Sequence, residues 1–138
     1  MNALLNSFWQ TSSTVTPQRI TNIGAFNTLV DAVSNLDLYE SNDEPKPSLV
    51  LVHRAADILS SVSLENAEVA PSYGEINVTW KANGVRVKAT FGPDPDVFYV
   101  YREGFENGRV AYSHMEENAS AAYLQSSLQW LASPFANV

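Results

Sequence analysis

The side chains best suited to chemistry in this sequence are its two histidines, each of which has carboxylates nearby. His53 and Asp57 are four residues apart, so on a helix their side chains would meet on one face. A carboxylate that orients an imidazole is the supporting half of a catalytic triad. His114 precedes Glu116 and Glu117, and an imidazole with two carboxylates could hold a metal ion.

The groups that would complete either kind of site are missing from the sequence. No serine lies in a G-x-S-x-G nucleophile elbow, and no cysteine is present to act as nucleophile, disulfide partner or thiolate ligand. The H-x-E pattern lacks a second cluster of ligands, and the acids between residues 40 and 44 lack the register of an EF-hand calcium loop. We therefore expect a protein that is not an enzyme and that uses no cofactor or metal.

Charge is the most informative feature of the composition. The chain has 138 residues and a formal net charge of −7. Residues 31–74 carry eight acidic and two basic side chains, a net charge of −6, whereas residues 75–109 are neutral. Such a local acidic field can steer a basic partner and repels nucleic acid; the alternative is a solvated surface that only keeps the protein soluble. The acids that we expect to contact a partner are Asp37, Glu40, Asp43, Glu44, Glu65 and Glu68.

Three helices are expected to hold these acids in place. Apolar residues recur every three or four positions between Ile20 and Leu36, as on one face of a helix. Ser48 can cap a second helix that runs to about Val62. A third helix is predicted from about Asn118 to Leu131, and residues 1–19 are expected to form an arm that is either docked or flexible.

The middle of the chain predicts an antiparallel sheet. Apolar and polar residues alternate in 75–80 and 85–91, on either side of an Asn-Gly turn at residues 83–84. Further strands are predicted at 97–101 and 109–114, with a turn at 104–108 between them. The expected fold class is therefore α+β, a single domain over residues 1–138. In it, an antiparallel meander of three to four strands packs against two N-terminal helices and one C-terminal helix.

Basic and aromatic side chains are interleaved on the predicted sheet. Arg86 and Lys88 project from one face, and Tyr99 and Tyr101 share a strand face. This arrangement is found in some binders of single-stranded nucleic acid. Because the segment has no net charge, we expect no direct nucleic-acid binding and instead cross-strand pairs on a protein-facing surface.

No membrane association is expected. The longest apolar stretches fall far short of the roughly 20 residues that span a bilayer. Residues 1–10 have no Lys or Arg before their apolar patch, unlike a signal peptide, so the expected location is cytoplasmic.

Three segments of residues 36–101 follow a known pattern: Leu36-Asp37-Leu38-Tyr39, Pro47-Ser48 through Leu59, and Pro71 through Trp80. They resemble the W-D-G-Y-like segment, the Pro-Ser helix start and the P-x-x-D-G-x-I-x-L-E-W hairpin of a loose group of small, uncharacterised bacterial and phage proteins. The chain departs from that group at Leu36 and Leu38, where the group has Trp and Gly. The resemblance implies a phage or mobile-element setting and carries no activity.

Together these features predict an acidic, non-enzymatic module that binds and neutralises a partner protein. An anti-CRISPR-like or antitoxin-like inhibitor that occupies a basic nucleic-acid-binding surface would fit this description. The alternative is a structural or assembly subunit, either a phage particle component or a homo-oligomer. It would associate through an aromatic sheet surface formed by Phe98, Tyr99, Tyr101 and Tyr112.

Overall fold

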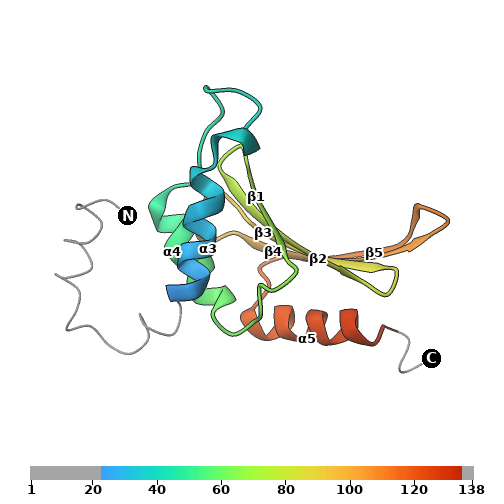
Figure 1. The fold of residues 1–138 in the computed structure, drawn as a ribbon. Helices are drawn as coiled ribbons and strands as arrows, with labels where there is room; N and C mark the ends of the chain where they lie inside the picture. The colour runs from blue at the N-terminus through green and yellow to red at the C-terminus, as the bar shows by residue number, and fades with distance from the viewer. Residues whose placement is uncertain (1–22, 135–138) are drawn as a thin grey trace.

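A five-stranded antiparallel sheet organises the computed structural model, which describes residues 23–134 (Figure 1). Its strands lie side by side in chain order, so that each strand pairs with the next. The predicted α+β fold is confirmed, with five strands in place of three to four. The strands are β1 (Glu68–Ser72), β2 (Glu75–Ala82), β3 (Val85–Phe91), β4 (Phe98–Glu106) and β5 (Arg109–Glu116).

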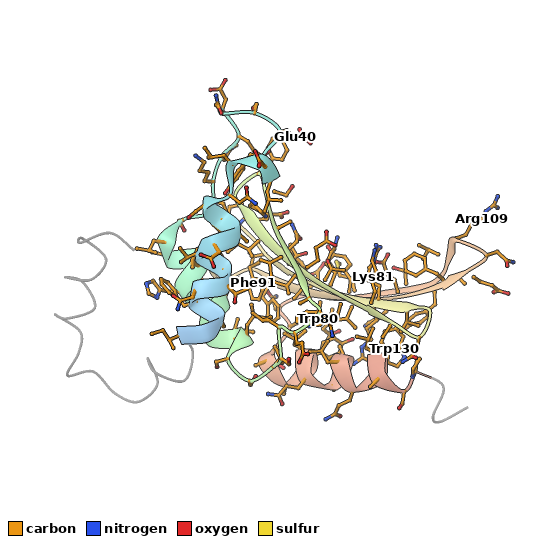
Figure 2. All side chains as sticks on the ribbon, viewed as in Figure 1. Glu40, Trp80, Lys81, Phe91, Arg109 and Trp130 are labelled. Atoms are coloured by element: carbon orange, nitrogen blue, oxygen red, sulfur yellow. The ribbon has the colours of Figure 1, made fainter. Side chains whose placement is uncertain are left out.

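The alternation of apolar and polar residues decides which face of the sheet is buried. Ile76, Val78 and Trp80 of β2 are at most 5% exposed, while the residues between them remain partly accessible. Figure 2 shows Trp80 on the helix side of the sheet and Lys81 on the opposite side. One face therefore forms the core, and the other stays open.

Within residues 23–134, three α-helices cover the core face (Figure 1). Helices α3 (Ile23–Ser34) and α4 (Leu49–Leu59) pack on each other at one end of the sheet, and α5 (Ala121–Ala132) runs beneath the other end. Ser48 caps α4 as predicted, because its side chain accepts a hydrogen bond from the backbone N–H of Leu51 at 3.1 Å. Among the described helices, none has the length and apolar character that crossing a bilayer requires.

Helix α4 stops three residues short of its predicted end at Val62. The hydroxyl groups of Ser60 and Ser61 donate to the carbonyl oxygens of Asp57 and Ile58, at 2.7 and 3.4 Å, and so compete with further helical bonds. The predicted N-terminal arm, residues 1–19, lies outside the described residues.

Two features of the sheet differ from the sequence prediction. Strand β1 was not expected, because its Pro71 cannot donate to a ladder; β1 is an edge strand, where proline is tolerated. The predicted turn at 104–108 is wrong, since β4 continues to Glu106 and only Asn107 and Gly108 turn, both with positive φ. Gly104 instead marks a shift of register between β4 and β5, which is characteristic of a β-bulge.

Arg102 attaches α5 to the sheet. From β4 its guanidinium donates to the hydroxyl oxygens of Ser127 and Ser126, at 2.8 and 3.0 Å. The same group lies 4.6 Å from the ring centre of Tyr123 and 5.7 Å from that of Trp130. A planar cation can make both kinds of contact at once, so this side chain fixes the angle at which α5 crosses the sheet.

Replacing Arg102 with methionine is expected to lower the free energy of unfolding by about 1–2 kcal/mol, because two hydrogen bonds and two cation–π contacts are lost. Chemical denaturation followed by circular dichroism measures this change. Lys81→Met, which removes a basic side chain at an exposed position in the same sheet, is the control. Equal stability of the two variants would show that Arg102 does not hold the helix.

Candidate protein-binding site

The six predicted contact acids do not form one surface. Glu65 and Glu68 lie before and at the start of β1, whereas Asp37, Glu40, Asp43 and Glu44 lie at its other end, near Tyr73. Four extended residues lie between Glu68 and Tyr73, which places them roughly 15 Å apart. The acidic segment therefore supplies two separate groups of carboxylates.

Glu44 stabilises the loop that carries its neighbours. It is only 6% exposed, and its two carboxylate oxygens accept the backbone N–H groups of Glu40 and Tyr73, each at 2.9 Å. Since both oxygens already have donors inside the fold, we assign Glu44 to holding the loop, and its contact with a partner stays a prediction. Tyr39 adds a second anchor, because its hydroxyl donates to the carbonyl oxygen of Val33 at 2.6 Å. Burial, together with the charge of Glu44, raises the pKa of Tyr39.

Glu40 joins this loop to the β1–β2 turn. Its carboxylate accepts a hydrogen bond of 2.6 Å from the hydroxyl of Tyr73, a residue with a φ of 48°. The hydrogen bond and the charge of Glu40 raise the pKa of the Tyr73 hydroxyl. Since Glu44 also bonds to Tyr73, two carboxylates fix the turn against the loop.

Exposed apolar side chains lie among the acids of this loop. Leu36 and Leu38 belong to the short 3-10 helix η1 (Leu36–Leu38) and are 63% and 40% exposed; Tyr73 is 55% exposed. Apolar and aromatic side chains surrounded by polar ones are typical of protein interfaces. We call this surface the acidic end, and it comprises Leu36, Asp37, Leu38, Glu40, Asp43 and Tyr73.

The sheet topology brings further acids to the acidic end. In an antiparallel meander, the β1–β2 and β3–β4 turns fall at the same end of the sheet. A Cβ atom on Gly74 would lie 3.5 Å from Cγ of Pro93, so the two turns are neighbours. The β3–β4 turn carries Asp94 and Asp96, both exposed. Sequence reasoning missed them, because their segment is neutral overall and only the fold separates these acids from its basic residues.

The two histidines lie in different surroundings. The ring of His53 stacks on Phe26, with 4.7 Å between ring centres, and so takes part in packing. Nε2 of His114 lies 3.6 Å from an oxygen of Glu116, and both side chains are about half exposed. Within residues 23–134, no three His, Cys, Asp or Glu side chains are placed to share a metal ion.

Two basic residues of the open sheet face have partners on the neighbouring strand. Nε of Arg86 donates to Glu103 on the neighbouring strand at 2.8 Å, and Nζ of Lys88 lies 4.8 Å from the ring centre of Tyr101. By strand register the same face carries three basic residues, Lys81, Arg86 and Lys88, and three acidic ones, Glu68, Glu75 and Glu103, so it has no net positive charge to offer a phosphate backbone.

The aromatic sheet surface considered for self-assembly is not a single surface. Phe98 is only 4% exposed and stacks on Phe91 in the core. Strand alternation sends Tyr99 and Tyr101 to the open face, whereas Tyr112 lies 6.2 Å from the Trp130 ring on the helix side. The four residues named for that surface therefore lie on both faces of the sheet.

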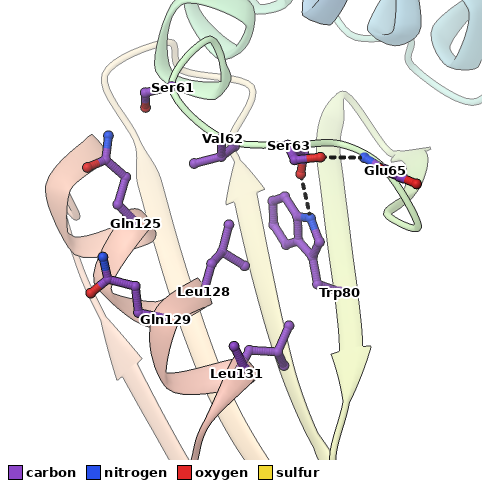
Figure 3. A pocket seen from close by; sticks show the side chains of 10 residues that line it. Ser61, Val62, Ser63, Glu65, Trp80, Gln125, Leu128, Gln129 and Leu131 are labelled. Carbon is purple, nitrogen blue, oxygen red and sulfur yellow. Dashed lines mark hydrogen bonds between the residues drawn. The ribbon is translucent and has the colours of Figure 1, made fainter.

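A shallow groove of about 510 Å³ lies beside Trp80, between the segment after α4 and helix α5 (Figure 3). The indole N–H of Trp80 donates to the carbonyl oxygen of Ser63 at 3.1 Å. Leu128 and Leu131 line the groove together with Glu65. Since no residue of the acidic end lines it, Glu65 belongs to a different surface from the loop acids.

In comparisons with family models, curated proteins and solved structures, nothing matched the chain. The resemblance of residues 36–101 to small phage proteins therefore stays a prediction. The function has to be argued from the geometry described above.

Replacing Glu44 with glutamine is expected to destabilise the protein by about 1–3 kcal/mol. An amide offers one acceptor oxygen where the carboxylate offers two, so one of the N–H groups of Glu40 and Tyr73 loses its bond. Denaturant unfolding measures the change. The matched control is Asp43→Asn, the same substitution type at the exposed neighbour. A Glu44 variant as stable as this control would contradict the anchoring role.

The Tyr73 hydroxyl is expected to titrate above the usual value of about 10. Because folding favours its neutral form, the resulting stabilisation is present below pH 10 and is lost as the pH rises through the pKa of the folded protein. The difference between the ultraviolet absorbance titration curves of the wild type and of Tyr73→Phe isolates the titration of this hydroxyl. Glu40→Gln should lower its pKa, and Asp43→Asn should leave it nearly unchanged; an unaltered pKa in the Glu40 variant would contradict the assignment.

Proposed function

We propose that the chain is a non-enzymatic protein-binding module that binds a basic partner protein through its acidic end. The observation that carries the proposal is the exposure of Leu36, Leu38 and Tyr73 among carboxylates on a loop whose geometry is fixed by buried Glu44. Exposed apolar groups supply contact area, and the surrounding charges supply orientation and rate. Asp94 and Asp96 strengthen the field at the same end.

Rigidity supports this function as much as charge does. A loop that must be ordered on binding loses part of its interaction free energy to that ordering. Here η1 begins with a cap, since the side chain of Asn35 accepts the N–H of Asp37 at 3.1 Å. Together with the bonds to Glu44, this cap holds the exposed side chains in place before a partner arrives.

The partner that fits this surface is a protein with a basic face. Nucleic-acid-binding proteins carry such faces, since they must neutralise phosphates. A module that covers one would block access to nucleic acid, which is how an anti-CRISPR-like or antitoxin-like inhibitor neutralises its target. The charge of the acidic end is what supports this inhibitory role.

The test uses a partner captured from host lysate on the immobilised chain and identified by mass spectrometry. Asp37→Lys combined with Asp43→Lys should slow association by about tenfold or more at low salt and flatten its salt dependence, because steering charges are reversed. Stopped-flow or surface-plasmon kinetics measure both quantities.

Glu65→Lys combined with Glu68→Lys is the matched control, since it changes the net charge equally on the separate surface. The two double variants are therefore also compared at physiological salt, where charges are screened beyond about 8 Å; there the control should associate at close to the wild-type rate while the Asp37 and Asp43 variant stays slower. Equal slowing by the two double variants would mean that overall charge, and not the acidic end, drives association. An association rate that neither double variant lowers would also contradict the proposal.

A further inference from the structure

The two edges of the sheet are protected to very different degrees. Edge β1 has only five residues, includes Pro71 and packs beside α3. Short length, proline and a covering helix are the usual means by which proteins prevent an edge from pairing with another strand. Edge β5 has eight residues without proline, of which seven are exposed. Within residues 23–134, no strand pairs with its outer side.

Exposed apolar side chains follow β5 on both faces. Val110 and Met115 lie opposite Phe105 and Tyr101 on the open face, and are 50% and 40% exposed. Tyr112 lies on the helix side near Trp130 and is 50% exposed. A strand added outside β5 would therefore cover apolar surface on both layers and satisfy the free N–H and C=O groups of the edge.

The charges of β5 favour a second copy of the same strand. The strand starts at Arg109 and ends at Glu116, which is followed by Glu117. Antiparallel pairing of two copies places the basic end of each beside the acidic end of the other, whereas parallel pairing would place like charges together. We propose that two copies of this chain associate by antiparallel pairing of their β5 strands.

In this dimer the two five-stranded sheets would join at β5 into one continuous sheet, with a two-fold axis at its centre. Pairing of the whole strand, residues 109–116, places Arg109 of each copy opposite Glu116 of the other, and the two-fold axis passes between Tyr112 and Ser113. The loop that carries Glu40 and Glu44 is bonded to the β1–β2 turn, at the edge of the sheet opposite β5. Association through β5 and the proposed partner binding are therefore separate properties, and each can fail alone.

Sedimentation equilibrium from the low micromolar to the millimolar range, at low salt, tests the proposal. The wild type should show a reversible equilibrium between monomer and dimer. Arg109→Glu should weaken the dimer about tenfold or more, since two symmetry-related attractions become repulsions. Glu116→Lys combined with Glu117→Lys should weaken it similarly.

The most decisive test mixes the Arg109→Glu variant with the Glu116→Lys, Glu117→Lys variant. In a mixed dimer, the glutamate at 109 of one copy faces lysines of the other, and the unchanged Arg109 faces unchanged Glu116 and Glu117. Association should therefore return in the mixture to near the wild-type constant. A wild type that stays monomeric throughout, or variants that do not rescue each other, would overturn the proposal.

Amide hydrogen exchange gives an independent readout on the same samples. The β5 amides of the wild type should exchange more slowly as concentration rises, while those of β1 should not change. Circular dichroism and thermal unfolding of each variant show that its fold is retained. Concentration-dependent protection outside β5, or none in it, would place any dimer interface elsewhere and overturn the proposal.

Discussion

Burial of a single face of the sheet is the constraint on which the rest of the structure depends. Because β2 and β3 alternate strictly, Ile76, Val78, Val87 and Ala89 all reach the core with no exposed surface. A one-residue slip in register would send this set to the open face, so the pairing is strongly specified. The fixed register in turn decides which turns meet at each end and which edge remains free.

The acidic end is a consequence of that register. Strand β1 pairs with β2 along its whole length, from Ser72 opposite Glu75 to Glu68 opposite Thr79. This pairing holds the β1–β2 turn where Tyr73 can bond to Glu40 and Glu44. The 3-10 helix and its loop are thereby fixed to the sheet by side chains and not by a further secondary element. A surface that combines high exposure with a fixed backbone is well suited to recognition.

Features that depend on neighbouring residues in the chain predict the helices and strands well. Features that depend on residues far apart in the chain are not visible in the sequence. The cap at Ser48, the alternation in 75–91 and the Asn83-Gly84 turn each depend on neighbours in the chain, and all three are confirmed. Strand β1 was missed because Pro71 is compatible with a strand only at an edge, and edges are known only once the sheet is assembled. Gly104 alone predicts a turn as readily as a bulge, because glycine is common in both.

The site was harder to predict than the fold for the same reason. Nothing in the loop marks Glu44 as buried, since one of its two donors is Tyr73, 29 residues further along the chain. Nor could segment charges show that Asp94 and Asp96 join the loop acids. The spacing of Leu36 from Val33 predicts that Leu36 continues the apolar face of the first helix; that prediction is wrong, because α3 ends at Ser34 and Leu36 is 63% exposed.

The central claim is that the acidic end is where this chain meets its partner. Hydrogen exchange of the complex with the captured partner, compared with the free chain, tests it most directly. The account predicts slower exchange at residues 36–44, at Tyr73 and Gly74, and in the turn at 94–96, with little change beside Trp80. Protection confined to the Trp80 groove or to the open sheet face, with residues 36–44 unchanged, would contradict it.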